Sequence, residues 1–476
     1  MVYWEGLNPQ NAIDTYKGYF RDNLLFFKDW STVYPNADIF NPDGTIHYSE
    51  SIQGSAGTCY IISALGSLGR YPDLVRNTFV TPTKNSAGII GVKFWIRGKP
   101  WVVDVDESMI WMYYNNPTLF YTKVSADKKA MWAAILQKAW AKVKGNYMTS
   151  EYGFFENGIY ALTGTPVIRY QTADITSYGD AEKAWAKIRA ADAADWLMGA
   201  ATGAGSDQNF NDYGIALGHA YSLLTAFELV EGSTVHKVVM FRNPWGTAHY
   251  HGPWSKDDSR WTSQLVAQVP YGIDVRTAQQ AEGVFIVPID LLIGSRNCFD
   301  NYQIAHQRAS EGYKQTWYDQ EGDDGQQKAY TFTVDSSASS DVYFQVSTYA
   351  QNIIPPSCTT GVFQGQTINL PIIFYAVYAG NTEIAGAAYV DQFPRPSVVG
   401  ASSHSQGTTY AIYVQVYYFG SPHPDHTVKV YSKYNSQILE NGRSNQLNMD
   451  GQQPSGFTDS DYRGMDHNSC GLRFVQ

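Results

Sequence analysis

Apolar positions follow a helical period in one part of the chain and a strand-like pattern in others. Between residues 130 and 144, Met131, Ile135, Ala139 and Val143 recur at intervals of four, which predicts a helix with one buried stripe. Short apolar runs bounded by Gly, Asn and Pro predict strands at 91–97, 101–106, 220–229, 235–241 and 284–287. Helices and strands therefore mix over roughly the first 300 residues, which indicates an α+β region.

The pattern changes near residue 310. Alternating apolar and polar positions predict short strands at 328–334, 342–348, 372–377, 410–418 and 427–434. Turns rich in Gly, Pro and Ser join them, as in an antiparallel β-sandwich. We divide the chain into an N-terminal extension (1–45), a helical domain (46–164), a β-rich domain (165–308), a sandwich (309–436) and a polar tail (437–476).

Composition narrows the class of protein. The 476 residues carry a net charge of -10 and no run of Lys or Arg, which argues against binding to nucleic acid. The 35 tyrosines point to a contact surface. The four cysteines lie far apart, so neither a zinc motif nor a disulfide framework is predicted. Without a leader-like start or roughly 20 consecutive apolar residues, we expect a cytoplasmic protein with reduced thiols.

One of these cysteines, Cys59, stands at the junction of a glycine-bearing turn and a predicted apolar helix. At that position the helix dipole favours thiolate over thiol. Gln53 lies six residues upstream and can fold back to offer an amide donor beside the sulfur. This arrangement is typical of a nucleophile with half an oxyanion hole.

The β-rich domain supplies groups that could serve such a nucleophile. His219 follows Gly218, and Asn243 can accept a hydrogen bond from an imidazole N–H. Trp245 can shield that hydrogen bond from water. The segment 199–214, rich in Gly, Ala, Asn and Asp, predicts a mobile loop at the edge of a site.

Each of these residues also has an ordinary structural interpretation. Cys59 alone is typical of a small core residue, and His219 alone of a core or surface histidine. The Asn-Pro-Trp-Gly segment alone is typical of a turn with an aromatic plug. Together, however, Gln, Cys, His and Asn occur in the order found in thiol proteases, each in a glycine-containing segment. That agreement favours the catalytic interpretation.

Three blocks carry a resemblance to a known family. QGSAGTC at 53–59, GHAYS at 218–222 and RNPWG at 242–246 resemble the signature blocks of the calpain family of cysteine proteases. Weaker similarities lie between them, and the resemblance covers about residues 46–305. It implies a papain-like core of two subdomains with a cleft between them. The region 309–436 is then similar, by position and strand pattern, to the C2-like β-sandwich that follows the core in many calpains.

The resemblance also implies roles for individual residues. Cys59 is expected to be the nucleophile, and His219 the general base and later the acid. Asn243 is expected to orient His219, while Gln53 lines the oxyanion hole with the backbone N–H of Cys59. Three further residues would shield or line the cleft: Trp245, Gly199 and Gly218. Calpains usually have Asp-Cys-Trp at the nucleophile, whereas this chain has Thr58-Cys59-Tyr60.

Calcium is a further implication of the resemblance. Each subdomain of a typical calpain core binds one calcium ion through oxygen ligands. Glu50 and Glu156 fall where the acids of the first site are expected, although both also fit ordinary surface carboxylates. At the second site His249 replaces an acidic ligand, and Asp257 and Glu282 are the remaining candidates. We therefore predict weakened or partly lost calcium binding in the second subdomain.

Two functions stay open on the sequence alone. The first is an intracellular calpain-like endopeptidase that makes limited cuts in protein substrates. The alternative is a non-proteolytic scaffold on a calpain fold, associated with the cytoskeleton or a cilium. In either case the sandwich offers a surface for a cytoskeletal or membrane-surface partner. No EF-hand pattern occurs, so no small EF-hand subunit is expected.

Overall fold

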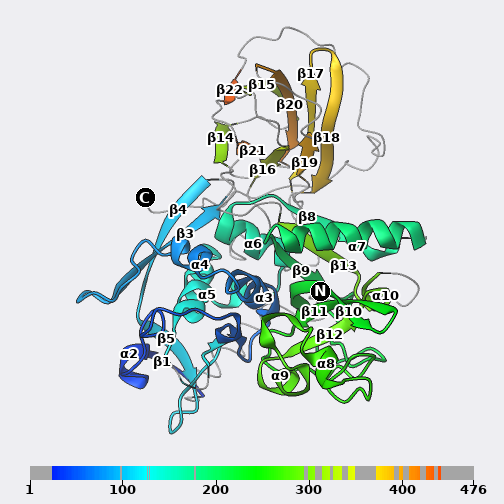
Figure 1. Ribbon diagram of the computed structural model, residues 1–476. Helices are drawn as coiled ribbons and strands as arrows, with labels where there is room; N and C mark the ends of the chain where they lie inside the picture. The colour runs from blue at the N-terminus through cyan, green and yellow to red at the C-terminus, as the bar shows by residue number, and fades with distance from the viewer. Residues whose placement is uncertain are drawn as a thin grey trace. The chain divides into compact units, whose positions relative to one another are not determined.

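The computed structural model describes residues 24–96, 99–125, 127, 129–175, 178–293, 298–305, 314–321, 325–334, 341–348, 371–390, 396–399, 407–418, 425–433 and 438–440. The chain divides into two compact units, which are described separately (Figure 1). The first comprises 1–94, 101–163 and 168–306, and the second comprises 95–100, 164–167 and 307–476. Residues 1–23 of the predicted extension and most of the predicted tail lie outside the described residues.

The first unit holds all the helices of the described chain. They are α2 (Trp30–Val33), α3 (Cys59–Leu68), α4 (Pro72–Thr78), α5 (Trp132–Val143), α6 (Phe155–Thr163), α7 (Tyr178–Ala193), α8 (Ser263–Val266), α9 (Val275–Ala281) and α10 (Ile289–Leu292). The helix predicted at 130–144 is confirmed as α5, and the helix predicted after Cys59 is confirmed as α3. In α5 the buried surface is wider than the predicted stripe, because Trp132, Gln137 and Trp140 are buried as well.

A six-stranded sheet forms the β-rich part of the first unit, with strand order β12-β11-β10-β9-β13-β8. Its strands are β8 (Val167–Gln171), β9 (Leu197–Ala201), β10 (Ala220–Glu231), β11 (Thr234–Arg242), β12 (Val284–Pro288) and β13 (Asn301–Ala305). The strands predicted at 220–229, 235–241 and 284–287 are confirmed as β10, β11 and β12. These three are antiparallel neighbours.

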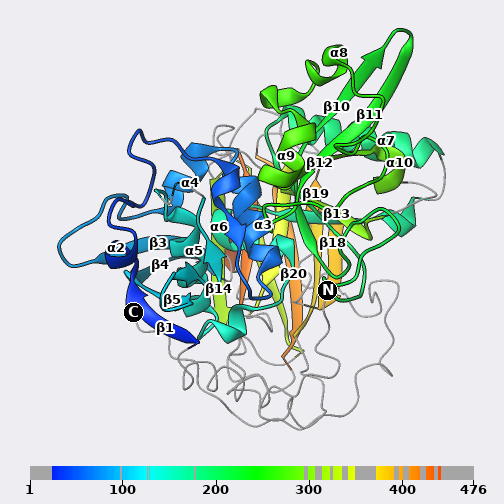
Figure 2. The same cartoon turned by 90° about the horizontal axis from the view of Figure 1, so that it is seen from below.

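Alternation along β10, β11 and β12 gives this sheet two buried faces. On one face Leu223, Val239 and Phe285 share a core cluster with residues of α7 and α10. On the other face Leu224 and Met240 share a second cluster with residues of α8 and α9. Figure 2 shows α8 and α9 beside the β10–β11 hairpin. Because both faces of the sheet are covered, the sequences of these strands are mostly apolar and lack alternating polar positions.

The remaining strands of the first unit lie in small sheets. They are β1 (Leu25–Asp29), β2 (Ile52–Gln53), β3 (Ile89–Ile96), β4 (Lys99–Asp106), β5 (Ser108–Met112), β6 (Thr118–Leu119) and β7 (Thr122–Lys123), paired as β1-β5-β6, β2-β7 and β3-β4. The strands predicted at 91–97 and 101–106 are confirmed as β3 and β4, whose connecting ends belong to the second unit. Leu25 of β1 packs with Ala56 and Ile110, so this part of the predicted extension belongs to the core.

The second unit contains two antiparallel sheets around one hydrophobic core. Their orders are β14-β21-β16-β19 and β18-β17-β20-β15-β22, with β14 (Lys314–Glu321), β15 (Gln327–Thr333), β16 (Val342–Ser347), β17 (Ile372–Ala379), β18 (Thr382–Val390), β19 (Ser397–Val399), β20 (Thr409–Tyr417), β21 (Asp425–Ser432) and β22 (Ile438–Glu440). The five predicted strands are confirmed within a few residues. Strand β22 lies in the predicted polar tail, because Ile438 enters the core. Within the described ranges, no helix is long and apolar enough to cross a membrane.

Candidate active site

Cys59 is the first residue of α3 and follows a turn that is packed too tightly for side chains. A Cβ atom on Gly54 would lie 2.0 Å from the carbonyl oxygen of Phe120. A Cβ atom on Gly57 would lie 2.8 Å from the ring of Tyr152. Glycine at both positions therefore lets the turn approach its neighbours and present Cys59 at the helix N-terminus.

Cys59 as a whole residue is partly exposed, whereas its sulfur is enclosed by protein. Burial raises the pKa of the Cys59 thiol, and backbone N–H groups of Ala220 and Tyr60 act in the opposite direction. The sulfur thus lies beside Ala220, the residue that follows His219. Burial is the largest of these effects, so the thiol form is favoured at neutral pH.

His219 is buried and held by Asn243 through a hydrogen bond of 2.9 Å between Nε2 and Oδ1. The backbone N–H of Trp245 donates to the same Oδ1 at 3.1 Å. An amide oxygen only accepts, so Nε2 carries the proton and Nδ1 is the unprotonated nitrogen. None of the residues that the structure describes bonds to Nδ1. Burial lowers the pKa of His219 to about 4, partly offset by the Asn243 hydrogen bond, so the ring is neutral at pH 7.

The backbone before β10 fixes the position of His219. Its N–H donates to Thr202 Oγ1 at 3.0 Å, and its carbonyl accepts from the Thr202 N–H at 3.0 Å. The N–H of Gly218 donates to the carbonyl of Gly203 at 2.7 Å. Gly218 has a φ of 54°, a conformation that favours glycine. The predicted loop at 199–214 therefore begins within β9. Its residues Thr202 and Gly203 hold the backbone of Gly218 and His219 in place.

Asn243 is held at the end of β11 by two backbone contacts. Its N–H donates to the carbonyl of Gly283 at 3.0 Å, and its carbonyl accepts from Gly246 at 3.1 Å. The ring of Trp245 lies 4.5 Å from the ring of His219, measured between centroids. The ring of Trp245 therefore packs beside the imidazole, and its role as a shield against water stays a prediction.

Two serines join the helix of Cys59 to the strand after His219. Ser63 Oγ donates to the carbonyl of Ala220 at 2.8 Å, and Ser222 Oγ donates to the carbonyl of Ser63 at 2.7 Å. In this buried contact, a serine of α3 donates to a carbonyl of β10, and a serine of β10 donates to a carbonyl of α3. This pair of bonds sets α3 against β10 and brings the two predicted blocks together. This contact could not be predicted, because both serines look like ordinary helix and strand residues in the sequence.

Arg242, the first residue of the RNPWG block, makes a second connection between the two halves of the core. It is fully buried, and its three nitrogens donate to the carbonyls of Ser51 at 2.8 Å, Ser49 at 3.3 Å and Glu282 at 3.1 Å. Burial lowers the pKa of Arg242 to about 10, which leaves it charged at neutral pH. The signal for this role was an arginine that directly follows the apolar strand at 235–241.

Gln53 lies next to this connection in β2. Its backbone N–H donates to the carbonyl of Pro244, and its Nε2 donates to the carbonyl of Ala56, both at 2.8 Å. The side chain is 4% exposed, and within the described chain its Oε1 has no hydrogen-bond partner. Gln53 therefore contacts both the turn before Cys59 and the segment after Asn243.

Gly199 has a different environment from the other predicted cleft residues. It lies within β9, where it pairs with Ser222 on one side and Gln303 on the other. A Cβ atom there would lie 2.6 Å from the ring of Phe155 in α6. Glycine at this position therefore allows α6 to pack directly on the sheet.

Comparison with known proteins identifies the family. Residues 10–291 match the description "Calpain family cysteine protease". The chain belongs to the calpain family of cysteine proteases. The family core is a mixed α+β fold, and in this member additional antiparallel β-sheets follow it.

Curated calpains differ greatly from this chain in length. The calpain-type cysteine protease ADL1 of Oryza sativa subsp. japonica is 30% identical over 245 residues, which are 51% of this chain and 11% of that protein. Calpain-12 of Mus musculus is 30% identical over 218 residues, 44% of this chain and 28% of that protein. The solved clostridial cysteine protease Cwp84 aligns over 86% of this chain and 94% of its own, at 12% identity and a TM-score of 0.23. That score is too low for a comparison of fold.

The calcium ligands expected from the calpain resemblance have other partners. Glu50 is 6% exposed and accepts the backbone N–H of His47 at 3.0 Å, Trp132 Nε1 at 2.6 Å and a hydrogen bond from Asn41 Nδ2. Three donors occupy its two oxygens and stabilise the negative charge. This carboxylate therefore acts as a hydrogen-bond acceptor for its own subdomain.

Each of the other three carboxylates also has a partner within the protein. Glu156 forms an ion pair with Arg169 at 2.5 Å, and Glu282 accepts the Tyr48 hydroxyl at 2.8 Å. Asp257 is exposed and pairs with the lysine before it. In the part of the chain that the structure describes, no three His, Cys, Asp or Glu side chains gather as a metal-binding group. Calcium binding by these residues therefore stays a prediction.

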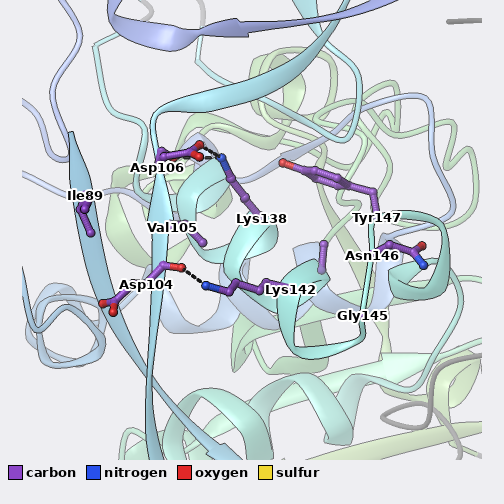
Figure 3. A pocket seen from close by; sticks show the side chains of 10 residues that line it. Ile89, Asp104, Val105, Asp106, Lys138, Lys142, Gly145, Asn146 and Tyr147 are labelled. Atoms are coloured by element: carbon purple, nitrogen blue, oxygen red, sulfur yellow. Dashed lines mark hydrogen bonds and ion pairs between the residues drawn. The ribbon is translucent and has the colours of Figure 1, made fainter. Parts of the chain in front are cut away.

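A pocket of about 500 Å³ lies between β4 and α5, and none of the residues predicted to be catalytic lines it (Figure 3). Both of its lysines contact the pocket's own walls. Lys138 forms an ion pair with Asp106, and Lys142 donates to the carbonyl of Asp104 at 2.7 Å (Figure 3). The pocket therefore offers no candidate for catalysis.

Proposed function

We propose that this calpain is a cysteine endopeptidase with Cys59 as nucleophile, His219 as general base and acid, and Asn243 as the group that orients His219. The protonation pattern of His219 is the observation that carries the proposal. Its Nε2–H is committed to Asn243 at 2.9 Å, while Nδ1 has no hydrogen-bond partner among the described residues. A nitrogen that is buried, neutral and unbonded is ready to accept a thiol proton.

Attack begins from a neutral pair. Burial keeps the pKa of Cys59 raised and that of His219 low, so the proton moves from sulfur to Nδ1 as the sulfur attacks the peptide carbonyl. The C–N bond then breaks, and His219 returns the proton to the leaving amine. The thioester that remains is hydrolysed by water, with His219 again accepting a proton. Trp245 keeps water from the His219–Asn243 bond in both steps.

Two donors are available for the negative oxygen that forms during attack. The backbone N–H of Cys59 lies in the first turn of α3, where helical N–H groups have no helical acceptor. Gln53 Nε2 carries two hydrogens and donates one to Ala56. We assign the second to the oxyanion. Loss of one such donor costs about 3–4 kcal/mol of transition-state stabilisation.

Proteins are the expected substrates, and the two halves of the core are held together without an assigned metal. Arg242 and the Ser63–Ser222 pair join segments of both halves through bonds that are already formed. A permanently joined core predicts activity that is limited by access of substrate rather than by assembly of the site. Cleavage would then fall in exposed, extended segments of other proteins, which gives limited cuts.

Peptide hydrolysis and covalent labelling test the proposal together. Purified protein should hydrolyse casein or an internally quenched peptide, and an epoxide thiol inhibitor should block hydrolysis and label Cys59. Cys59→Ala should abolish both. Cys298→Ala is the matched control, because Cys298 is another partly exposed cysteine of the described chain. A wild-type protein that takes no label at Cys59 and cleaves nothing would remove the endopeptidase proposal.

A further inference from the structure

Three aromatic rings form a surface beside His219, and the proposed chemistry uses only one of them, Trp245, as a shield. Phe210 lies 6.2 Å from Trp245 and 5.1 Å from His249, and Trp245 lies 6.3 Å from His249, between ring centroids. Phe210 is 43% exposed, which is unusual for a phenylalanine next to a buried centre. We call Phe210, Trp245 and His249 the aromatic shelf.

The shelf is supported by a loop with many internal hydrogen bonds. Asn211 Oδ1 accepts the backbone N–H groups of Tyr213 and Ile215, both at 3.0 Å. The His251 N–H donates to the carbonyl of Tyr213 at 3.0 Å, and its Nε2 lies 3.1 Å from the carbonyl oxygen of Asp212. These bonds tie the loop to the segment that carries His249. The exposed face of Phe210 is therefore preorganised, so little conformational entropy is lost when a ligand covers it.

The proposed reaction determines which part of a substrate lies next to the aromatic shelf. His219 must protonate the amine of the leaving fragment, so that nitrogen lies within hydrogen-bond distance of Nδ1. The residue that carries the nitrogen is the first one after the scissile bond. The Cα atom of that residue is bonded directly to this nitrogen. Its side chain therefore begins close to the rings that surround the imidazole. Two rings contact the imidazole, Trp245 at 4.5 Å and the buried Tyr221 at 4.9 Å, and the exposed Phe210 packs against Trp245.

We propose that the aromatic shelf is the subsite for the side chain directly after the scissile bond and that it selects aromatic and large aliphatic residues there. This inference rests on the proposed endopeptidase function. Phe210 meets Trp245 and His249 edge-on, at 74° and 72°, which leaves its own exposed surface for a substrate ring or branched side chain. Apolar contact of this kind discriminates by about 10–200-fold between side chains.

Acyl transfer isolates this subsite from every other contact. A peptide methyl ester acylates Cys59 and releases methanol. The thioester is then divided between water and an added amino acid amide, whose nitrogen forms the new C–N bond as the C–S bond breaks. The acyl group stays the same, so the ratio of products for two amides measures only the binding of the attacking residue. Phenylalaninamide and leucinamide should each be captured at least tenfold better than glycinamide by the wild-type protein.

Variants of Phe210 connect that preference to the shelf. Phe210→Ala should bring the phenylalaninamide-to-glycinamide ratio to within about threefold of unity, while Phe210→Leu should keep an intermediate preference. The control is Phe27→Ala, which removes a phenylalanine that is 59% exposed on β1 and should leave the ratio unchanged. Unchanged thermal unfolding of Phe210→Ala, together with unchanged epoxide labelling of Cys59, would show that its loss of preference is not a loss of fold.

Two results would overturn the inference, and they differ from failure of the proposed function. Equal capture of phenylalaninamide and glycinamide by an active wild-type enzyme would show that no apolar subsite exists there. An undiminished preference in Phe210→Ala would place the subsite elsewhere. If the wild-type protein forms no acyl-enzyme and takes no epoxide label, the endopeptidase proposal itself fails, and the inference falls with it.

Discussion

Asn243 determines which nitrogen of His219 carries the proton. The Asn243 Oδ1 atom accepts from His219 Nε2 at 2.9 Å and from the Trp245 N–H at 3.1 Å. The second bond fixes the orientation of the amide, and the amide in turn fixes the imidazole. His219 Nδ1 is then an acceptor by necessity, without a carboxylate in the third position. The arrangement is neutral throughout, which suits a site with little access to water.

Asn243→Ala should leave His219 free to rotate and to exchange protons between its nitrogens. We expect kcat to fall by about 10²–10⁴-fold, the usual value of a positioned general base. KM should change little, because Asn243 does not face the substrate. Steady-state hydrolysis of a quenched peptide measures both constants. An unchanged kcat, with Cys59 still labelled by the epoxide, would show that His219 needs no orienting group.

The pH dependence of Cys59 alkylation tests whether the resting pair is neutral. Burial raises the pKa of the thiol and lowers that of His219 to about 4, so neither group is charged between about pH 5 and 8. Only the thiolate reacts with iodoacetamide, and its fraction rises about tenfold per pH unit below the thiol pKa. The alkylation rate should therefore climb steadily from pH 6 to 8. A fast rate that is flat over this range would instead indicate a thiolate–imidazolium pair.

Local patterns predicted the elements that carry the site, and they did so for physical reasons. The four-residue spacing of apolar positions predicts α5, and apolar runs between Gly and Pro predict β10, β11 and β12. Cys59 at a helix start follows from the glycine turn before it. The apolar pattern alone did not predict β9, because a glycine interrupts the short apolar run Leu197–Ala201, and only the resemblance indicated a strand end at 197–199. Its strand character comes from pairing with β10 and β13.

The connections between distant segments could not be predicted from one sequence. Glu50 accepts a hydrogen bond from Trp132, which lies 82 residues away in the sequence. The local pattern contains no information about that contact. Ser63 and Ser222 are likewise 159 residues apart. The order of motifs predicts that Cys59, His219 and Asn243 belong to one site. It does not predict which side chains hold the site together.

Gly66→Ala tests the contact between α3 and β10. Alanine normally stabilises a helix interior by about 1 kcal/mol relative to glycine. Here a Cβ atom would lie 2.6 Å from Ser222 Oγ and 3.3 Å from Arg242 Nη1, so the helix would have to shift away from the strand. We expect Gly66→Ala to lower Tm and to slow peptide hydrolysis.

Removing the obstructing hydroxyl supplies the control for that substitution. Ser222→Ala alone should cost about 1 kcal/mol of unfolding free energy, because it removes one hydrogen bond to the carbonyl of Ser63. The double variant Gly66→Ala/Ser222→Ala should be more stable than the sum of the two single effects, as expected for residues in contact. A Gly66→Ala protein as stable as the wild type would contradict the close contact.

A substitution of Glu50 tests whether its carboxylate binds calcium or only accepts hydrogen bonds from its own chain. Glu50→Gln keeps the size of the side chain but turns an NH₂ group toward donors on His47 and Trp132. We expect the free energy of unfolding to fall by about 1–3 kcal/mol, the cost of leaving a buried donor without its acceptor. Thermal unfolding in EGTA and in millimolar CaCl₂ gives the readout. Calcium bound elsewhere in the chain would stabilise both proteins equally, so the Tm difference between wild type and variant should be the same in both buffers. Asp257→Asn, at an exposed carboxylate, should match the wild type in both. A calcium-dependent rise in Tm that Glu50→Gln abolishes would restore Glu50 as a metal ligand.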